Sequence, residues 1–224
     1  MTVAARARAA GADEDLFEAC DGIEPLGPGA AILRGFARPA AAALLAAVRG
    51  VAARAPFRHM VTPGGFRMSV ALTNCGALGW VSDRTGYRYD RIDPASGREW
   101  PRMPAALLRL AHDAAAAAGF AGFVPDACLV NRYEPGARLT LHQDRNERDF
   151  TAPIVSVSLG VPAVFVFGGA KRADRVARVR LVHGDVVVWG GPARMRFHGV
   201  LALKPAHHPA LGSRRINLTF RKAG

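Results

Sequence analysis

The sequence predicts a mainly β protein, a double-stranded β-helix (jelly roll) with flanking helices. Two observations carry this prediction. From residue 127 onward, short apolar and alternating segments follow one another, separated by turn residues. Two earlier segments are rich in Ala and Leu, which favours helices that cover a sheet. A β-rich chain of 224 residues is routinely one domain and is long enough to bury a substantial core.

The predicted elements follow in order. A short strand is expected at residues 30–36, a helix from Pro39 to about Arg54, and a second helix between Trp100 and Phe120 that ends near Gly119. We find no internal repeat and no linker, so residues 25–224 are predicted to be one domain whose core spans 127–224, behind a flexible tail at 1–24. The strands expected in the core are residues 127–133, 138–142, 154–159, 164–167, 176–181, 185–189, 197–203 and 215–221.

Residues 56–93 differ in composition, because glycines alternate with large side chains. Glycine supplies turns and aromatic rings supply flat faces, so this segment suits a hairpin-rich lid over a binding site. An ordinary β-meander with core aromatics explains the pattern equally well, and we prefer that interpretation for Tyr89. The residues concerned are Gly64, Gly65, Gly76, Gly79, Gly86, Phe66, Met68, Trp80, Tyr87 and Tyr89.

The segment Leu-Thr-Leu-His-Gln-Asp at 139–144 contains the first candidate metal ligands. His142 and Asp144 are two residues apart, so in a strand their side chains leave from the same face. His198 is the best candidate for a third ligand. Two His and one carboxylate with open positions form the facial triad of non-heme Fe(II) oxygenases. A surface His beside a solvated acid is the alternative, since His-x-Asp alone is common.

The C-terminal segment 214–221 alternates polar and apolar residues. Arg215, Asn217, Thr219 and Arg221 would share one strand face, with the apolar residues on the other. A solvated outer face would give the same alternation. Two inward-facing Arg side chains, however, are what a dicarboxylate cosubstrate needs.

Composition and charge narrow the class of partner. The chain has 30 Lys and Arg against 18 Asp and Glu, a net charge of +12, which favours a polyanion such as nucleic acid. Biased codon usage could also enrich Arg and Ala, so charge alone does not decide. The three scattered cysteines form no zinc spacing and fit a reducing, cytoplasmic setting, with Cys75 and Cys128 as buried thiols. No secretory signal or transmembrane helix is expected.

Taken together, several segments closely resemble the AlkB family of Fe(II)- and 2-oxoglutarate-dependent nucleic-acid dealkylases. They occur in the family's order over roughly residues 25–224, which is far more specific than one motif. The matching segments are residues 60–70 (Met-Val-Thr-Pro-Gly-Gly-Phe-Arg-Met-Ser-Val), 73–80 (Thr-Asn-Cys-Gly-Ala-Leu-Gly-Trp), 125–137, 142–144 (His-Gln-Asp), 152–160, 183–191 and 217–221 (Asn-Leu-Thr-Phe-Arg).

The resemblance implies roles for individual residues. It implies Fe(II) on His142, Asp144 and His198, with O₂ as a further cosubstrate. For 2-oxoglutarate it implies Arg215 on the distal carboxylate and Arg221 toward the metal-bound carboxylate. The remaining cosubstrate contacts that it implies are Asn131, Tyr133, Leu139, Asn217 and Thr219.

The resemblance also implies how a base would be bound. Trp80 and Tyr87 match the residues that hold the flipped-out alkylated base, and Arg172 matches a position near the nucleic acid. Two positions depart from the best-known bacterial members. Asn146 stands where they carry Asp, which puts the preference between adenine and cytosine lesions in doubt. Leu72 stands where a Met lines the pocket, a swap that conserves volume.

The implied activity is oxidative dealkylation of N1-methyladenine and N3-methylcytosine in DNA. It is coupled to the conversion of 2-oxoglutarate to succinate and releases formaldehyde. We expect a monomer that acts on alkylated nucleic acid, with single-stranded DNA preferred and no membrane partner. Three alternatives remain: an RNA demethylase of the same class, a non-catalytic metal- and nucleic-acid-binding module, and a protein or small-molecule hydroxylase on the same fold.

Overall fold

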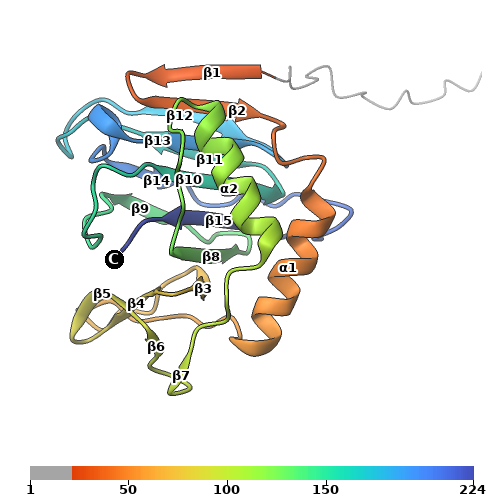
Figure 1. Cartoon of the computed structure of the whole chain (residues 1–224), viewed down its shortest axis with the longest axis vertical. Helices are drawn as coiled ribbons and strands as arrows, with labels where there is room; N and C mark the ends of the chain where they lie inside the picture. Colours follow the sequence, from red (N-terminus) through yellow and green to blue (C-terminus); the bar gives the residue numbers. More distant parts are fainter. Residues whose placement is uncertain (1–21) are drawn as a thin grey trace, which may run out of the picture.

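The computed structural model describes residues 22–224, and its core is a sandwich of two antiparallel sheets (Figure 1). The larger sheet has the order β1-β2-β13-β10-β15-β8-β3 and the smaller one β12-β11-β14-β9. The large sheet contains β1 (Gly22–Gly27), β2 (Ala30–Arg34), β3 (Ala71–Gly76), β8 (Ala127–Tyr133), β10 (Ile154–Gly160), β13 (Val186–Trp189) and β15 (Arg215–Arg221). The small sheet contains β9 (Leu139–His142), β11 (Ala163–Phe167), β12 (Ala177–Leu181) and β14 (His198–Val200). This arrangement confirms the predicted jelly roll with flanking helices.

Two helices cover the outer face of the large sheet, α1 (Ala41–Arg54) and α2 (Ala105–Ala117) (Figure 1). The buried residues of α1 recur every three or four positions, which places one apolar stripe against the sheet. Beyond α2, Gly119 has a φ of +89°, a conformation that favours glycine and ends the helix where the sequence predicted. The helices and the outer face of the sheet share one apolar core.

A second apolar core fills the space between the two sheets. Successive side chains of strand β15 point alternately to the two faces of the large sheet, and so toward different cores. Ile216, Leu218 and Phe220 belong to the core under the helices, whereas Arg215 and Asn217 point to the opposite side of the strand, into the sandwich. The alternation at 214–221 therefore reflects an inward-facing polar row, and the solvated alternative is wrong.

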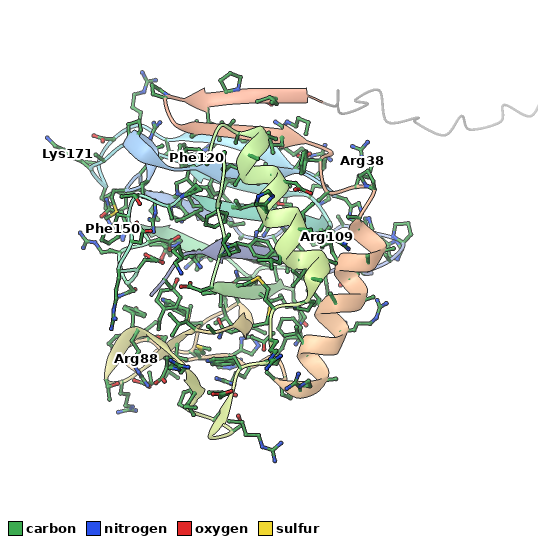
Figure 2. The ribbon with its side chains drawn as sticks, in the orientation of Figure 1. Arg38, Arg88, Arg109, Phe120, Phe150 and Lys171 are labelled. Atoms are coloured by element: carbon green, nitrogen blue, oxygen red, sulfur yellow. The ribbon has the colours of Figure 1, made fainter. Side chains whose placement is uncertain are left out.

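Two small hairpins occupy the end of the molecule beyond β3 (Figure 1). One pairs β4 (Gly79–Asp83) with β5 (Gly86–Asp90), and the other pairs β6 (Ile92–Asp93) with β7 (Arg98–Glu99). In Figure 2 the labelled Arg88 marks the first hairpin, at the same edge of the molecule as the loops that carry Phe150 and Lys171.

Several predicted boundaries were wrong. The strand expected at residues 30–36 ends at Arg34, because Gly35 turns the chain with a φ of +66°. Residues 22–24, expected in the tail, begin β1, which pairs with β2 from Gly22↔Arg34 onward. Its side chains are mostly exposed and it contains Pro25, so nothing but pairing marks it as a strand. Strand β14 ends at Val200 instead of 203, because Leu203 leaves the sheet to exchange backbone hydrogen bonds with the turn at Gly136 and Ala137. The rest of the predicted tail, with Cys20, lies outside the described residues.

Among residues 22–224, no helix is both long enough and apolar enough to cross a membrane. Cys75 and Cys128 are buried, as predicted, and form no disulfide within the described part of the chain; they lie directly opposite each other on β3 and β8.

Candidate active site

A cavity of about 340 Å³ opens between the sheets and the hairpin β4–β5, and every predicted site residue lines it. Strands far apart in the sequence bring these residues together. The residues are Leu72 from β3, Trp80 and Tyr87 from the hairpin, Asn131 and Tyr133 from β8, Leu139 and His142 from β9, Asp144, Asn146 and Arg172 from loops, His198 from β14, and Arg215, Asn217, Thr219 and Arg221 from β15.

Two histidines and a carboxylate meet at one end of this cavity. His142 lies directly opposite His198 in the pairing of β9 with β14. Nε2 of His142 is 3.7 Å from Oδ1 of Asp144, and Nε2 of His198 is 3.6 Å from Oδ2. One ligand atom from each of the three residues falls within 4.8 Å of the others. The cluster therefore has the composition and spacing of a facial triad.

The backbone fixes the tautomers of both imidazoles. Nδ1 of His142 donates to the carbonyl of Thr140 at 2.8 Å, and Nδ1 of His198 donates to the carbonyl of Arg196 at 3.0 Å. A carbonyl only accepts hydrogen bonds, so each Nδ1 bears the proton and each Nε2 keeps a lone pair toward Asp144.

The charge states in the cluster suit a cation. Burial, helped by the neighbouring His142, lowers the pKa of His198 to about 3, so this ring is neutral at physiological pH. Burial opposes ionisation of Asp144, but the guanidinium of Arg221 outweighs it and holds the pKa of that carboxyl below its usual range. The neutral imidazole of His198 and the carboxylate of Asp144 are ligand forms that a divalent metal requires.

Arg215 presents a buried guanidinium that lacks an anion. The residue is 2% exposed, its Nη2 donates to Ser158 Oγ at 2.9 Å, and its guanidinium lies over the ring of Tyr133. Its Nε and Nη1 are buried and have no hydrogen-bond partner among residues 22–224. Burial lowers the pKa of Arg215, but not enough to discharge a guanidinium. A buried charge with free donors indicates a site for a bound carboxylate.

The amide of Asn217 organises the floor between Arg215 and the metal cluster. Its Nδ2 donates to Ser156 Oγ and to the carbonyl of Val157, and its Oδ1 accepts from Asn131 and Thr219. Sequence reasoning missed Ser156 and Ser158. The polar alternation Ser-Val-Ser in β10 was their only signal.

The hairpin β4–β5 closes the other end of the cavity. The rings of Trp80 and Tyr87 are stacked at 5.6 Å between centroids with 17° between planes. Asn74 fixes the strand at Trp80 by accepting from its N–H and donating to its carbonyl, both at 3.0 Å. A Cβ at Gly79 would lie 2.3 Å from the indole of Trp100, so only glycine fits there. Together these contacts hold two flat rings over the cavity.

Three further predicted residues, Asn146, Arg172 and Leu72, line the same cavity. Nδ2 of Asn146 donates to the carbonyl of Tyr87 at 3.4 Å. Arg172 is exposed, donates to the carbonyl of Leu141 at 2.6 Å and lies over the ring of Phe197. Leu72 is fully buried in the wall. Among the described residues, the only carboxylate in the cavity lining is that of Asp144, which belongs to the metal cluster.

A buried ionic network behind Asp144 was not predicted. Arg221 donates to Oδ2 of Asp144 from Nη2 at 2.8 Å and from Nε at 3.0 Å. Glu147 lies 3.3 Å from Arg221 and 3.2 Å from Arg194. The sequence places Glu147 only five residues after His142, but nothing in that spacing signals two guanidinium partners.

Comparison with known proteins identifies the family. A family model described as the 2OG-Fe(II) oxygenase superfamily matches residues 29–221. The chain is 58% identical over 200 residues to the alpha-ketoglutarate-dependent dioxygenase AlkB of Salmonella typhimurium, covering 89% of this chain and 93% of that protein. The chain belongs to the AlkB family of 2-oxoglutarate- and Fe(II)-dependent oxygenases.

Two further comparisons agree. The AlkB homolog of Caulobacter vibrioides is 48% identical over 182 residues, 81% of each chain. The solved structure of OsALKBH1 superposes with a TM-score of 0.78 at 28% identity, covering 90% of this chain and 100% of that one. The AlkB-like chain is therefore a dioxygenase that uses Fe(II), 2-oxoglutarate and O₂.

The side chains that line the cavity suit Fe(II) and 2-oxoglutarate, independently of the comparisons. The lone pairs of His142 and His198 converge with the carboxylate of Asp144, which suits Fe(II). The free donors of Arg215 suit a carboxylate at the end of a dicarboxylate chain. The metal supplies the redox chemistry with O₂, and the protein supplies the ligands, the anion site and a partly apolar wall.

Proposed function

We propose that the chain removes alkyl groups from N-alkylated nucleic-acid bases by oxidation, with N1-methyladenine and N3-methylcytosine in DNA as substrates. The reaction converts 2-oxoglutarate to succinate and CO₂ and releases the alkyl carbon as formaldehyde. The observation that carries this proposal is one cavity that contains the His142, Asp144 and His198 cluster, an anion site at Arg215, and two stacked rings at the mouth.

His142, Asp144 and His198 are proposed as the iron ligands, and Arg215 as the partner of the distal carboxylate of 2-oxoglutarate. Asn217, held by four hydrogen bonds, sets the floor between the two sites. Arg221 acts beside the metal, holding Asp144 and facing the inner carboxylate. The further cosubstrate contacts are Asn131, Tyr133, Leu139 and Thr219, which line the same part of the cavity.

Trp80 and Tyr87 are proposed to grip the extruded base, because stacking binds any base by its flat face. Leu72 forms the apolar wall, Asn146 contacts the base edge, and Arg172 contacts a phosphate. Extrusion costs a few kcal/mol and least for a single-stranded or damaged base, so we propose that single-stranded DNA is preferred. Residues 56–93 then act as the nucleotide-recognition lid and 127–224 as the catalytic core.

The protein is proposed to work as a cytoplasmic monomer. Cys75 and Cys128 face each other as free thiols, which fits a reducing compartment. All the proposed site residues come from one chain, so the site needs no second copy.

The decisive experiment is mass spectrometry of a single-stranded DNA oligonucleotide that contains one N3-methylcytosine. It is incubated with protein, Fe(II), 2-oxoglutarate, ascorbate and air. Loss of one methyl group that requires 2-oxoglutarate is expected. Asp144→Ala should abolish this loss while oligonucleotide binding remains, which separates an enzyme from a non-catalytic binding module. The matched RNA oligonucleotide tests the RNA demethylase alternative.

Succinate without loss of the methyl group would contradict the proposed substrate and leave an oxygenase of another substrate class. Faster turnover of the RNA than of the DNA would reverse the proposed preference.

A further inference from the structure

A buried carboxylate, Glu147, connects the hairpin β4–β5 to the residues behind the metal cluster. The Tyr89 hydroxyl donates to Oε1 of Glu147 at 2.7 Å, and Nε of Arg221 lies 3.3 Å from the same oxygen. Arg221 in turn donates twice to Asp144. An unbroken chain of polar contacts therefore runs from the hairpin to a candidate iron ligand.

Arg194 holds Glu147 from the other side. Its Nη2 lies 3.2 Å from Oε2 of Glu147, and both side chains are 2% exposed. Its Nη1 donates to the backbone carbonyl of Asp144 at 3.1 Å, and its Nε donates to that of Ala152 at 3.2 Å. Two guanidiniums thus face two carboxylates in a buried, charge-balanced cluster. Such a cluster holds its members in one geometry because any displacement leaves a buried charge unpaired.

Tyr89 connects the buried ionic cluster to the hairpin strand that carries the stacked ring of Tyr87. In the pairing of β4 with β5, Tyr89 is directly opposite Trp80. Tyr87 is two residues earlier on β5, so its side chain leaves from the same face as that of Tyr89. The neighbour of Glu147, Asn146, also donates to the Tyr87 carbonyl. Residues 146 and 147 therefore contact β5 at two points.

We propose that the Tyr89–Glu147 hydrogen bond is a latch that holds the hairpin in register over the metal centre. Both are positioning residues, because they act through Trp80, Tyr87, Arg221 and Asp144. The tyrosine suits this role because burial raises its pKa well above the usual value and keeps the hydroxyl a donor. The consequence for base binding rests on the proposed function, whereas the consequence for the hairpin does not.

Tyr89→Phe tests the latch because it removes one hydroxyl and nothing else. Thr85→Val is the matched control, since it removes a hydroxyl that bonds Asp83 in the turn of the same hairpin. The first measurement is amide hydrogen exchange in protein loaded with Mn(II) and 2-oxoglutarate. Tyr89→Phe should speed exchange about tenfold in residues 79–90 and leave β8, β10 and β15 unchanged, whereas Thr85→Val should affect only the turn.

The second measurement is steady-state kinetics on the N3-methylcytosine oligonucleotide. Tyr89→Phe should raise KM for the oligonucleotide about tenfold and leave kcat and KM for 2-oxoglutarate within about twofold. Glu147→Ala should also raise KM for the oligonucleotide, and adding Tyr89→Phe to it should cause no further rise, because the acceptor of the Tyr89 hydroxyl is already gone.

Unchanged exchange in residues 79–90 of Tyr89→Phe would overturn the latch, whether or not any oligonucleotide is demethylated. Additive effects of Tyr89→Phe and Glu147→Ala on KM for the oligonucleotide would do the same. If the wild type does not demethylate the oligonucleotide but Tyr89→Phe speeds amide exchange in residues 79–90, the latch is supported and the proposed substrate is contradicted.

Discussion

Arg221 directs both Nη2 and Nε at the same oxygen of Asp144, Oδ2, at 2.8 Å and 3.0 Å. The other oxygen, Oδ1, lies 3.7 Å from Nε2 of His142. The guanidinium therefore sets the rotation of the carboxylate and keeps it ionised inside the protein. Metal affinity should depend on an arginine that does not itself bind the metal.

Arg221→Lys should weaken binding of a divalent metal by about 10- to 100-fold. A lysine is a point charge and does not reproduce the two hydrogen bonds that converge on Oδ2 from Nε and Nη2. Calorimetric titration with Mn(II) measures this change in affinity. Arg172→Lys is the control, because Arg172 contacts the carbonyl of Leu141 and no carboxylate. Equal Mn(II) affinity in Arg221→Lys and wild type would contradict the argument.

Arg215→Met should have opposite effects on stability and on activity. The free donors of Arg215 are buried, so removing the charge should stabilise the ligand-free protein by about 1–3 kcal/mol. Thermal melting should show this as a higher Tm, by roughly 2–4 °C per kcal/mol. The same variant should lose about 100-fold or more in kcat/KM for 2-oxoglutarate, measured as succinate formed.

Added 2-oxoglutarate distinguishes this explanation from simple repacking. With Mn(II) present, 2-oxoglutarate should raise the Tm of the wild type and leave that of Arg215→Met unchanged. A variant that is less stable than the wild type without ligand would show that Ser158 and Tyr133 already compensate the charge.

Much of this site could be predicted from the sequence because strand alternation is a local property. The spacing of His142 and Asp144, and the polar row from Arg215 to Arg221, follow from a period of two. The partners of Glu147 could not be predicted, because Arg194 and Tyr89 reach it from 47 and 58 residues away along the chain. Strand β1 was missed because it is an edge strand. Most of its side chains are exposed and it contains Pro25, so its sequence lacks the apolar alternation that predicts a strand.

Acid should destabilise the metal-free protein through His198. Its pKa is lowered to about 3, against about 6.5 in the unfolded chain, so between these values only the unfolded state binds the proton. The free energy of unfolding should therefore rise with pH across this window, and fall by about 1.4 kcal/mol per pH unit as pH drops. Urea unfolding of EDTA-treated protein from pH 4 to 6.5 measures it. His198→Asn should lower the slope of unfolding free energy against pH by about 1.4 kcal/mol per pH unit. A slope equal to that of the wild type would show that His198 is not the group responsible.

Asn146→Asp should shift lesion preference toward cationic bases. N1-methyladenine and N3-methylcytosine bear a positive charge, whereas N3-methylthymine is neutral. Among the described residues, the only carboxylate in the cavity lining is Asp144, which is already paired with Arg221. A new carboxylate should favour the cationic lesion and raise the ratio of kcat/KM for N3-methylcytosine over N3-methylthymine by about tenfold. Competition between the two oligonucleotides in one reaction measures the ratio directly. Asn146→Ala removes the contact with the Tyr87 carbonyl without adding charge, so it should leave the ratio near that of the wild type. If both variants changed the ratio equally, the position would act through the hairpin contact and not through charge.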